Sequence, residues 1–270
     1  EDGIYKGYIN GLNDPYSVYY NKKETKELYE STGGEYSGIG AVMSQNTETG
    51  VITLVQIYKD SPAEKAGLKE NDILYKVEGK EVTGKDLSKV VSKVKGEKGT
   101  TVELTVLRGE DAKEVTVTAT RDTVQAQTIE YKMMDDKIGY IRVSEFDTVT
   151  YDQYKEALDD LEKQGMTGLV VDLRNNPGGS LSTVCDMLDL MLPKGLIVYT
   201  EDKNGKKTEM KSDEEHQFTK PLAVLVNGNS ASASEIYSGA IQDYGIGKIV
   251  GTQTYGKGVV QQIFDLDDGT

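Results

Sequence analysis

Cysteine and histidine are almost absent from this chain, and their scarcity excludes several kinds of site. Cys185 is the only cysteine in 270 residues, so neither an intrachain disulfide nor a cysteine-based zinc site can form. His216 is the only histidine, which excludes a metal site built from several histidines. It lies in the charged stretch 212–217, which is typical of a solvated loop, so a Ser-His-Asp protease is not expected. The sequence therefore predicts chemistry without a metal, a cofactor or a histidine base.

Positive charge and long apolar runs are also lacking. Lysine and arginine number 31 against 45 aspartates and glutamates, so the formal net charge is −14. Such a chain repels nucleic-acid phosphates, and no nucleic-acid partner is expected. No apolar run approaches the ~18–20 residues that a membrane span needs, and no signal peptide is visible. The sequence begins within a helical pattern at Glu1 and stops within a pattern at Thr270, so we expect any membrane span or signal peptide to lie outside this stretch.

The length predicts two domains, preceded by a short helical segment over residues 1–35. Ile4, Tyr8 and Leu12 repeat at helical spacing, and a second short helix is expected over residues 23–29. This segment is too small to bury a core of its own, so we expect it to pack on another part of the protein.

Residues 36–121 read as short strands with two helices, which predicts a small barrel-like α/β domain. Strands are expected over 51–57, 72–77, 102–106 and 115–119, with a capped turn of helix at 61–66 and an amphipathic helix over 86–95. The arrangement resembles a PDZ domain, and three segments carry the resemblance: Tyr36–Ala41, Ser61–Leu68 and Asn71–Leu74.

A PDZ domain implies a partner with a free C-terminus. The loop Gly38-Ile39-Gly40-Ala41 leaves backbone N–H groups uncovered, and these can hold the C-terminal carboxylate of a peptide that adds as an extra strand. The helix over 86–95 would wall the groove and supply a pocket for an apolar last residue. The alternative is that Gly38 and Gly40 merely serve a tight turn.

Residues 122–270 alternate strands with helices, which is typical of an α/β core with largely parallel strands. Continuous apolar strands are expected at 168–174 and 221–227, since a strand covered on both faces lacks polar alternation. Further strands are expected at 139–143, 248–251 and 259–263, and a helix over 232–242.

The loops that follow three of these strands carry the candidate chemistry, because open α/β sheets place their sites there. Ser232 opens a helix, where free N–H groups and the helix dipole favour a developing oxyanion. Ser232 and Glu235 also form a capping-box pattern, so the serine could serve as a cap, and the two roles are compatible. Without histidine the serine needs another base, and Lys257 is the candidate if its apolar neighbours bury it in the neutral form.

Together these motifs resemble the C-terminal processing peptidases, also called tail-specific proteases. The resemblance covers nearly the whole chain and rests on four segments: Leu12–Ser17, Asp172–Gly179, Ser230–Glu235 and Thr254–Gln261. It implies a crotonase/Clp-like α/β protease core, in which the nucleophile lies 25 positions before the lysine; that position is Ser232. It also implies that Gln261 holds the amine of Lys257 and that the N–H groups of Gly179 and Ala233 form the oxyanion hole.

Two further residues are accessory candidates. The resemblance gives Asp243 an auxiliary role, and a plain surface carboxylate is the alternative. Arg108, at the tip of a hairpin, could pair with acidic groups of the protease core, or could be an exposed hairpin arginine.

The sequence thus predicts a serine endopeptidase with a Ser232–Lys257 dyad that cleaves polypeptides near their C-termini, with a PDZ domain that captures apolar tails and gates activity. Two other functions stay open, a catalytically silent PDZ scaffold and a crotonase-like acyl-CoA enzyme. The resemblance further implies an extracytoplasmic, membrane-anchored protein and a homodimer formed through upstream or terminal segments.

Overall fold

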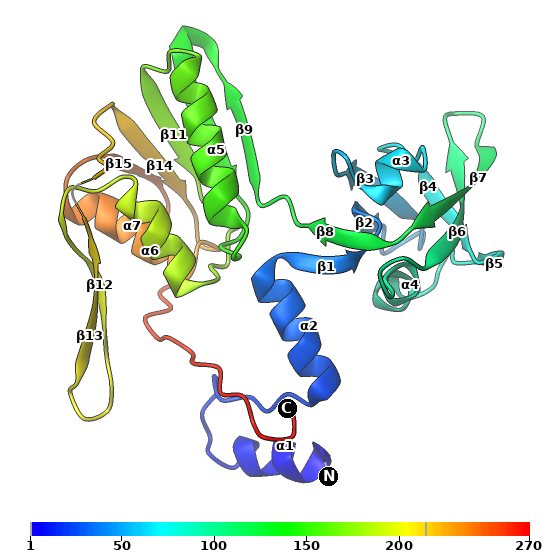
Figure 1. Ribbon diagram of the computed structural model, residues 1–270, viewed down its shortest axis with the longest axis horizontal. Helices are drawn as coiled ribbons and strands as arrows, with labels where there is room; N and C mark the ends of the chain where they lie inside the picture. The colour runs from blue at the N-terminus through cyan, green and yellow to red at the C-terminus, as the bar shows by residue number, and fades with distance from the viewer. Residues whose placement is uncertain (1, 214) are drawn as a thin grey trace. The chain divides into compact units, whose positions relative to one another are not determined.

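The computed structural model describes residues 2–213 and 215–270, and the chain forms two compact units (Figure 1). The smaller unit comprises residues 35–126, and the larger unit combines residues 1–34 with residues 127–270. The predicted small domain, 36–121, lies within the smaller unit. The N-terminal segment groups with the larger unit, where its packing partners lie.

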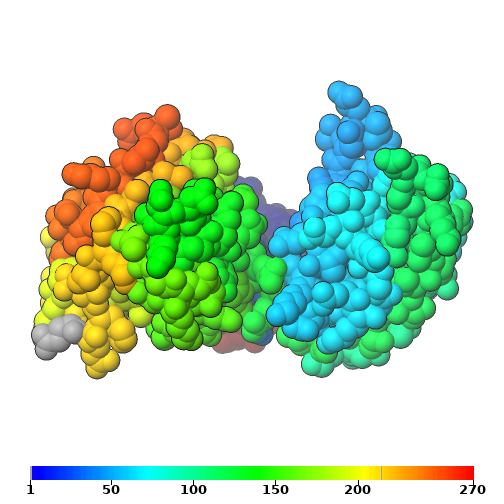
Figure 2. Space-filling model, turned by 90° about the horizontal axis from the view of Figure 1, so that it is seen from above, coloured from blue at the N-terminus to red at the C-terminus, as the bar shows by residue number. Residues whose placement is uncertain are grey.

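The smaller unit consists of short antiparallel strands and two helices (light blue to green in Figure 2). Its elements are β1 Glu35–Gly38, β2 Ala41–Gln45, β3 Ile52–Ile57, α3 Pro62–Lys65, β4 Ile73–Val77, β5 Lys80–Glu81, α4 Leu87–Val94, β6 Thr101–Arg108, β7 Lys113–Thr120 and β8 Asp122–Gln125. The main sheet has the order β2-β3-β4-β6-β7, and β5 pairs with β4. β1 and β8 form a separate antiparallel pair, and this pairing carries the unit past residue 121.

The apolar face of α4 closes the core of the smaller unit. Val90 and Val94 are buried there with Leu54, Leu74 and Leu104 from the sheet. Strand β2 lies at the edge of the sheet beside α4, so one side of its backbone is open to an additional strand.

The larger unit is built on a five-stranded sheet with helices packed against it. Its elements after residue 127 are β9 Ile129–Met133, η1 Asp135–Lys137, β10 Ile138–Val143, α5 Thr150–Lys163, β11 Gly168–Asp172, α6 Leu181–Asp189, β12 Gly195–Glu201, β13 Lys207–Ser212, β14 Leu222–Val226, α7 Ala233–Asp243 and β15 Lys248–Gly251. The strand order is β15-β14-β11-β10-β9, with every pair parallel except β10–β9. The predicted mixed α/β fold is confirmed.

The parallel strands bring three loops to one edge of this sheet. β11 ends at Asp172, β14 at Val226 and β15 at Gly251, and parallel strands end on the same side. On the helical layer, α5 and α7 meet through Tyr154 and Tyr237, two buried rings whose hydroxyls are 2.8 Å apart. This layer fixes α7, and with it the loop that precedes α7, against the sheet.

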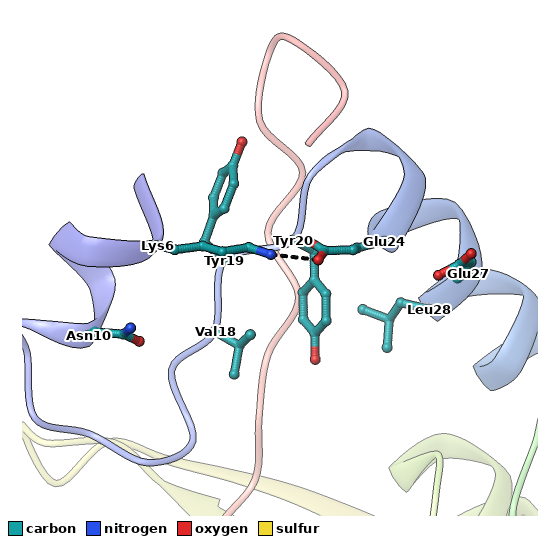
Figure 3. A pocket seen from close by; sticks show the side chains of 8 residues that line it. All are labelled: Lys6, Asn10, Val18, Tyr19, Tyr20, Glu24, Glu27 and Leu28. Atoms are coloured by element: carbon teal, nitrogen blue, oxygen red, sulfur yellow. Dashed lines mark hydrogen bonds and ion pairs between the residues drawn. The ribbon is translucent and has the colours of Figure 1, made fainter. Parts of the chain in front are cut away.

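The N-terminal segment contains two helices, α1 Asp2–Asn10 and α2 Lys22–Gly33. Asn21 caps α2, and Glu24 completes the capping box and pairs with Lys6 of α1 at a distance of 2.5 Å (Figure 3). The pair borders a pocket of about 380 Å³ between the two helices. α2 contacts the rest of the larger unit where the Thr148 N–H donates to the carbonyl of Thr32, at 3.1 Å.

Two expectations about secondary structure need correction. Residues 259–263, predicted as a strand, form neither strand nor helix, and the segment from 252 onward runs as an extended ribbon toward α1 and α2 (orange to red in Figure 1). Its alternating apolar residues find no partner strand among the described residues. The hairpin of β12 and β13 was not predicted; β12 is largely apolar, whereas β13 carries Lys207, Glu209 and Lys211.

The described residues contain no helix that is both long enough and apolar enough to cross a membrane.

Arg108 stabilises the smaller unit from within. Its guanidinium donates to both carboxylate oxygens of Asp72, at 2.8 and 2.6 Å, and to the carbonyl of Gly67. Asp72 is only 2% exposed, so the arginine neutralises a buried charge. Arg108 is therefore not a solvated hairpin arginine. Its acidic partner, Asp72, belongs to the smaller unit and not to the predicted protease core.

We predict that Arg108→Ala lowers the free energy of unfolding of the smaller unit by about 3 kcal/mol, because the Asp72 carboxylate stays buried without its partner. Urea-dependent hydrogen exchange of the amides of β4 and β6 measures this loss. Lys76→Ala is the control, since it removes an exposed ion pair with Glu114 in the same unit and should cost less than about 1 kcal/mol. Equal losses for the two variants would contradict the prediction.

Candidate active site

Ser232 lies on a sharp turn between β14 and α7, with a backbone conformation that few residues other than glycine adopt. Its φ is 54° and its ψ is −115°, and it immediately precedes the first residue of α7. Such a conformation costs about 1–3 kcal/mol and persists only where the surroundings impose it. The side chain of Ser232 is half-buried, so its hydroxyl lies at the surface of the helix N-terminus.

The loop after β11 lies directly against this turn. A Cβ atom built on Gly178 would be 2.8 Å from the Ser232 Cβ, 2.8 Å from the Ala231 carbonyl oxygen and 3.0 Å from the Ala233 nitrogen. Gly178 also has a φ of 107°. No other residue fits here, and this close approach places the next residue, Gly179, beside the nucleophile candidate.

Asn176 fixes the path of this loop from below. It is fully buried; its side chain accepts from the Gly178 N–H at 2.8 Å and donates to the Val143 carbonyl at 2.9 Å. Phe146 pairs with the same loop: its N–H donates to the carbonyl of Gly178, and its carbonyl accepts from the N–H of Ser180. The loop is therefore rigid before any ligand binds.

The N–H groups of Gly179 and Ala233 are the two donors that this packing leaves available. Ala233 is the first residue of α7, so its N–H has no partner within the helix. Across residues 2–213 and 215–270, no acceptor is recorded for either N–H. A Cβ on Gly178 would lie 3.0 Å from the Ala233 nitrogen, so the loop that carries Gly179 lies beside the first residue of α7.

The two neighbouring serines have structural partners instead. Ser230 is fully buried and its hydroxyl donates to the carbonyl of Leu173 at 2.8 Å. Ser234 is equally buried and its hydroxyl donates to the carbonyl of Asn176 at 3.0 Å. Of the three serines in the motif, only Ser232 exposes its side chain to an incoming molecule.

Lys257 lies on the third loop, beside the predicted Gln261 and beside Tyr16, which the sequence did not assign to the site. Its Nζ donates to the Oε1 of Gln261 at 3.0 Å and lies 5.4 Å from the ring centroid of Tyr16. The Gln261 amide in turn donates to the Tyr16 carbonyl at 2.9 Å. Tyr16 belongs to Leu12–Ser17, one of the segments that carry the family resemblance, and it borders the lysine.

The expectation that apolar neighbours bury Lys257 is wrong. Val259 and Val260 are 45% and 55% exposed, and Lys257 itself is half-buried. Within the described part of the chain, no hydrogen bond joins the Ser232 hydroxyl to the Lys257 amine. The lysine and the glutamine are brought together, whereas the serine and the lysine are not engaged.

The predicted carboxylate-binding loop lies at the start of the edge strand β2. The carbonyls of Ile39 and Gly40 point into the unit and accept from the N–H groups of Ala63 and Tyr58, at 2.7 and 3.0 Å. Gly40 has a φ of 77°, and a Cβ on it would lie 2.5 Å from the Cβ of Ser61. This loop is therefore built around its glycine, and its groove-side backbone continues into the open edge of β2 at Ala41.

Comparison with known proteins finds family matches in both units. Residues 137–270 match the model of peptidase family S41, and residues 53–108 match a PDZ domain. The chain therefore contains a region of peptidase family S41 and a PDZ domain. It is 39% identical over 270 residues to the carboxy-terminal processing protease CtpA of Bacillus subtilis and 38% identical over 267 residues to a probable CtpA-like serine protease of Staphylococcus epidermidis.

The chain covers 57% and 53% of those two proteins, so it spans about half the length of the curated relatives that it matches. Among solved structures, it resembles the photosystem II D1 C-terminal processing protease with a TM-score of 0.55 and 28% identity, over 98% of this chain and 72% of the other. The predicted resemblance to C-terminal processing peptidases is confirmed.

Two other residues singled out by the sequence lie outside the site. Asp243 is exposed at the last residue of α7, about 16 Å along the helix from Ser232, so the fold does not bring it to the dyad. His216 is exposed in the loop before β14 and contributes nothing to the site.

We predict that Ser230→Ala and Ser234→Ala lower the free energy of unfolding by about 1–2 kcal/mol each, because each removes a buried hydrogen bond to the loop beneath Ser232. Ser232→Ala should instead change the free energy of unfolding by less than about 0.5 kcal/mol, because no hydrogen bond of the Ser232 hydroxyl is present among the described residues and alanine bears the same backbone strain. Thermal unfolding of the three variants checks this order. A loss in Ser232→Ala as large as in the other two would contradict it.

Proposed function

We propose that this chain forms the catalytic and tail-binding part of a serine endopeptidase that cleaves polypeptides at or near their C-termini. The observation that carries the proposal is the strained Ser232 at the start of α7, with the donors of Gly179 and Ala233 beside it and the Lys257–Gln261 pair on a neighbouring loop. His216, the single histidine of the chain, is exposed in the loop before β14, which leaves Lys257 as the candidate base.

The chemistry then proceeds in two stages. The Ser232 hydroxyl attacks the scissile carbonyl carbon while a neutral Lys257 accepts its proton, and the N–H groups of Gly179 and Ala233 bind the oxyanion. The protonated lysine gives the proton to the leaving amine, and an acyl-enzyme remains. Water then attacks the ester by the same route and releases the acid. Gln261 holds the amine of the resting Lys257 through its Oε1.

The disengaged dyad favours gating over simple tethering by the PDZ domain. A tail that only raised local concentration would need no rearrangement at the serine. Here Lys257 must turn from Gln261 toward Ser232, and a tail can drive that change only if it binds the engaged state more tightly. Only α2 and its flanking residues separate the PDZ unit from the neighbours of Lys257 along the chain. α2 ends at Gly33 and β1 of the PDZ unit begins at Glu35, while Tyr16, before α2, contacts Gln261.

Assembly and location of the longer protein are proposed from the family resemblance. We propose an extracytoplasmic, membrane-anchored protein. We also propose a homodimer in which α1 takes part, because Ile4 and Tyr8 of α1 and the adjoining Leu12 are 74%, 75% and 58% exposed.

We predict that Ser232→Ala and Lys257→Ala each lower the kcat/KM for β-casein by about 10³-fold or more, because both partners are needed for proton transfer. His216→Ala is the matched control and should change the rate less than twofold. Mass spectrometry of the fragments provides the measurement. Full activity in Lys257→Ala, or none in His216→Ala, would overturn the mechanism, and an inactive wild type would favour a silent scaffold.

We predict that a short peptide with an apolar C-terminus, added in trans, raises kcat on a second, unrelated substrate. Gating requires this result, whereas tethering alone predicts competition and a slower rate. The same peptide with an amidated C-terminus is the control, and it should have no effect because the loop at Gly38–Ala41 binds a carboxylate. Equal effects of acid and amide would contradict the assignment of that loop.

A further inference from the structure

Glu235, three residues after Ser232, contacts more of the site than its capping position requires. Its Oε2 accepts from the Ser232 N–H at 2.9 Å, which is the capping contact predicted by the sequence. The same Oε2 accepts from the Lys257 N–H at 2.9 Å, and its Oε1 accepts from the Gly256 N–H at 2.7 Å. The Thr254 side chain donates to this carboxylate as well.

One oxygen atom therefore joins the backbones of the nucleophile and the base. The Ser232 and Lys257 nitrogens each lie 2.9 Å from Oε2, so they can be no farther apart than twice that distance. Lys257 belongs to a segment with neither helix nor strand. The Tyr255 N–H of this segment donates to the carbonyl of Ser230 at 3.0 Å, and the Thr252 N–H donates to the carbonyl of Val226, farther from the serine, at 3.3 Å. The position of Lys257 relative to Ser232 thus depends chiefly on Glu235.

The electrostatics of Glu235 suit this task. Burial alone would raise the pKa of the carboxyl, but the hydrogen bonds from Thr254, Gly256, Ser232 and Lys257 outweigh burial and lower the pKa below its ordinary value. The group is therefore ionised at neutral pH, and its contribution is lost only as the pH falls through the lowered pKa. An ionised carboxylate also suits the positive end of the α7 dipole.

The contact with Ser232 has a second consequence for the oxyanion site. The Ser232 N–H is occupied by Glu235 and cannot turn to a substrate. The donors that remain at the start of α7 and on the facing loop are Ala233 and Gly179. Glu235 thereby selects which backbone groups meet the oxyanion.

We propose that Glu235 is a positioning residue of the peptidase, which holds the loop of Lys257 in register with the Ser232 turn and without which the dyad does not assemble. This inference rests on the proposed function. It assigns Glu235 no contact with the substrate and no proton transfer.

Kinetics of two Glu235 variants test the proposal. Glu235→Ala should lower kcat on β-casein by about 100-fold, on the order of the cost of a 1 Å misplacement, with KM changed less than twofold. Glu235→Gln should lower kcat by a smaller factor, about 10-fold. The amide oxygen of glutamine can still accept a hydrogen bond, but its NH₂ group is a donor and would face backbone N–H groups that are also donors. A capping role alone predicts a loss of stability with unchanged kcat.

Glu24 provides a matched control. It occupies the same capping-box position on α2, where its carboxylate accepts from the Asn21 N–H at 2.9 Å, and it faces Lys6 instead of the dyad loops (Figure 3). Glu24→Gln should therefore lower stability to a degree similar to Glu235→Gln while leaving kcat within twofold of the wild type.

Hydrogen exchange of the Gly256 and Lys257 amides provides a readout that does not depend on activity. Both amides should exchange at least about 10-fold faster in Glu235→Gln, because each loses a charge-assisted acceptor, and should be unchanged in Glu24→Gln. If Glu235→Ala does not fold, Thr254→Val replaces it, with a smaller loss of kcat expected.

The outcomes separate this inference from the proposed function. Unchanged exchange, or faster exchange with full kcat, overturns the role of Glu235 while leaving the peptidase assignment intact. Equal inactivity of the wild type and Ser232→Ala contradicts the proposed function, and exchange at Gly256 and Lys257 still decides whether Glu235 holds the loop.

Discussion

The close contact between the loop at Gly178 and the turn at Ser232 is the constraint on which the rest of the site depends. There is no room for a side chain at Gly178, so the backbone of its loop packs directly against the backbone of the turn at Ser232. This contact places the loop of Gly178 and Gly179 against Ser232, whose φ is 54°, and against the Ala233 nitrogen. Buried hydrogen bonds of Asn176, Ser230 and Ser234 then hold both loops in place without using the nucleophile.

The lysine side of the site is built by different means. Lys257 has no regular secondary structure to support it, and its position comes from the Glu235 carboxylate below it and from Gln261 and Tyr16 beside it. The serine half is held by buried hydrogen bonds, whereas the lysine half has few buried contacts. This difference supports the proposed gating, in which the lysine half moves and the donors of the serine half are preorganised.

The N-terminal segment connects the lysine half of the site to the PDZ unit. The Gln261 amide donates to the Tyr16 carbonyl, and α2 ends one residue before β1 begins, so the segment that borders the lysine continues into the PDZ unit. The arrangement gives the segment before α2 a part in the site, although it bears no group that reacts.

The sequence by itself determined the α/β architecture and the candidate loops, because strand periodicity and loop motifs are local patterns. The family resemblance, which is also carried by the sequence, selected Ser232 and Gln261 as the partners of Lys257. Tertiary structure alone decided the partners of these residues. The role of Tyr16 depends on a contact across 245 positions, and the second function of Glu235 depends on one across 22. The exposure of Val259 and Val260 was mispredicted for the same reason, since an apolar run becomes a buried strand only where a neighbouring strand accepts its hydrogen bonds.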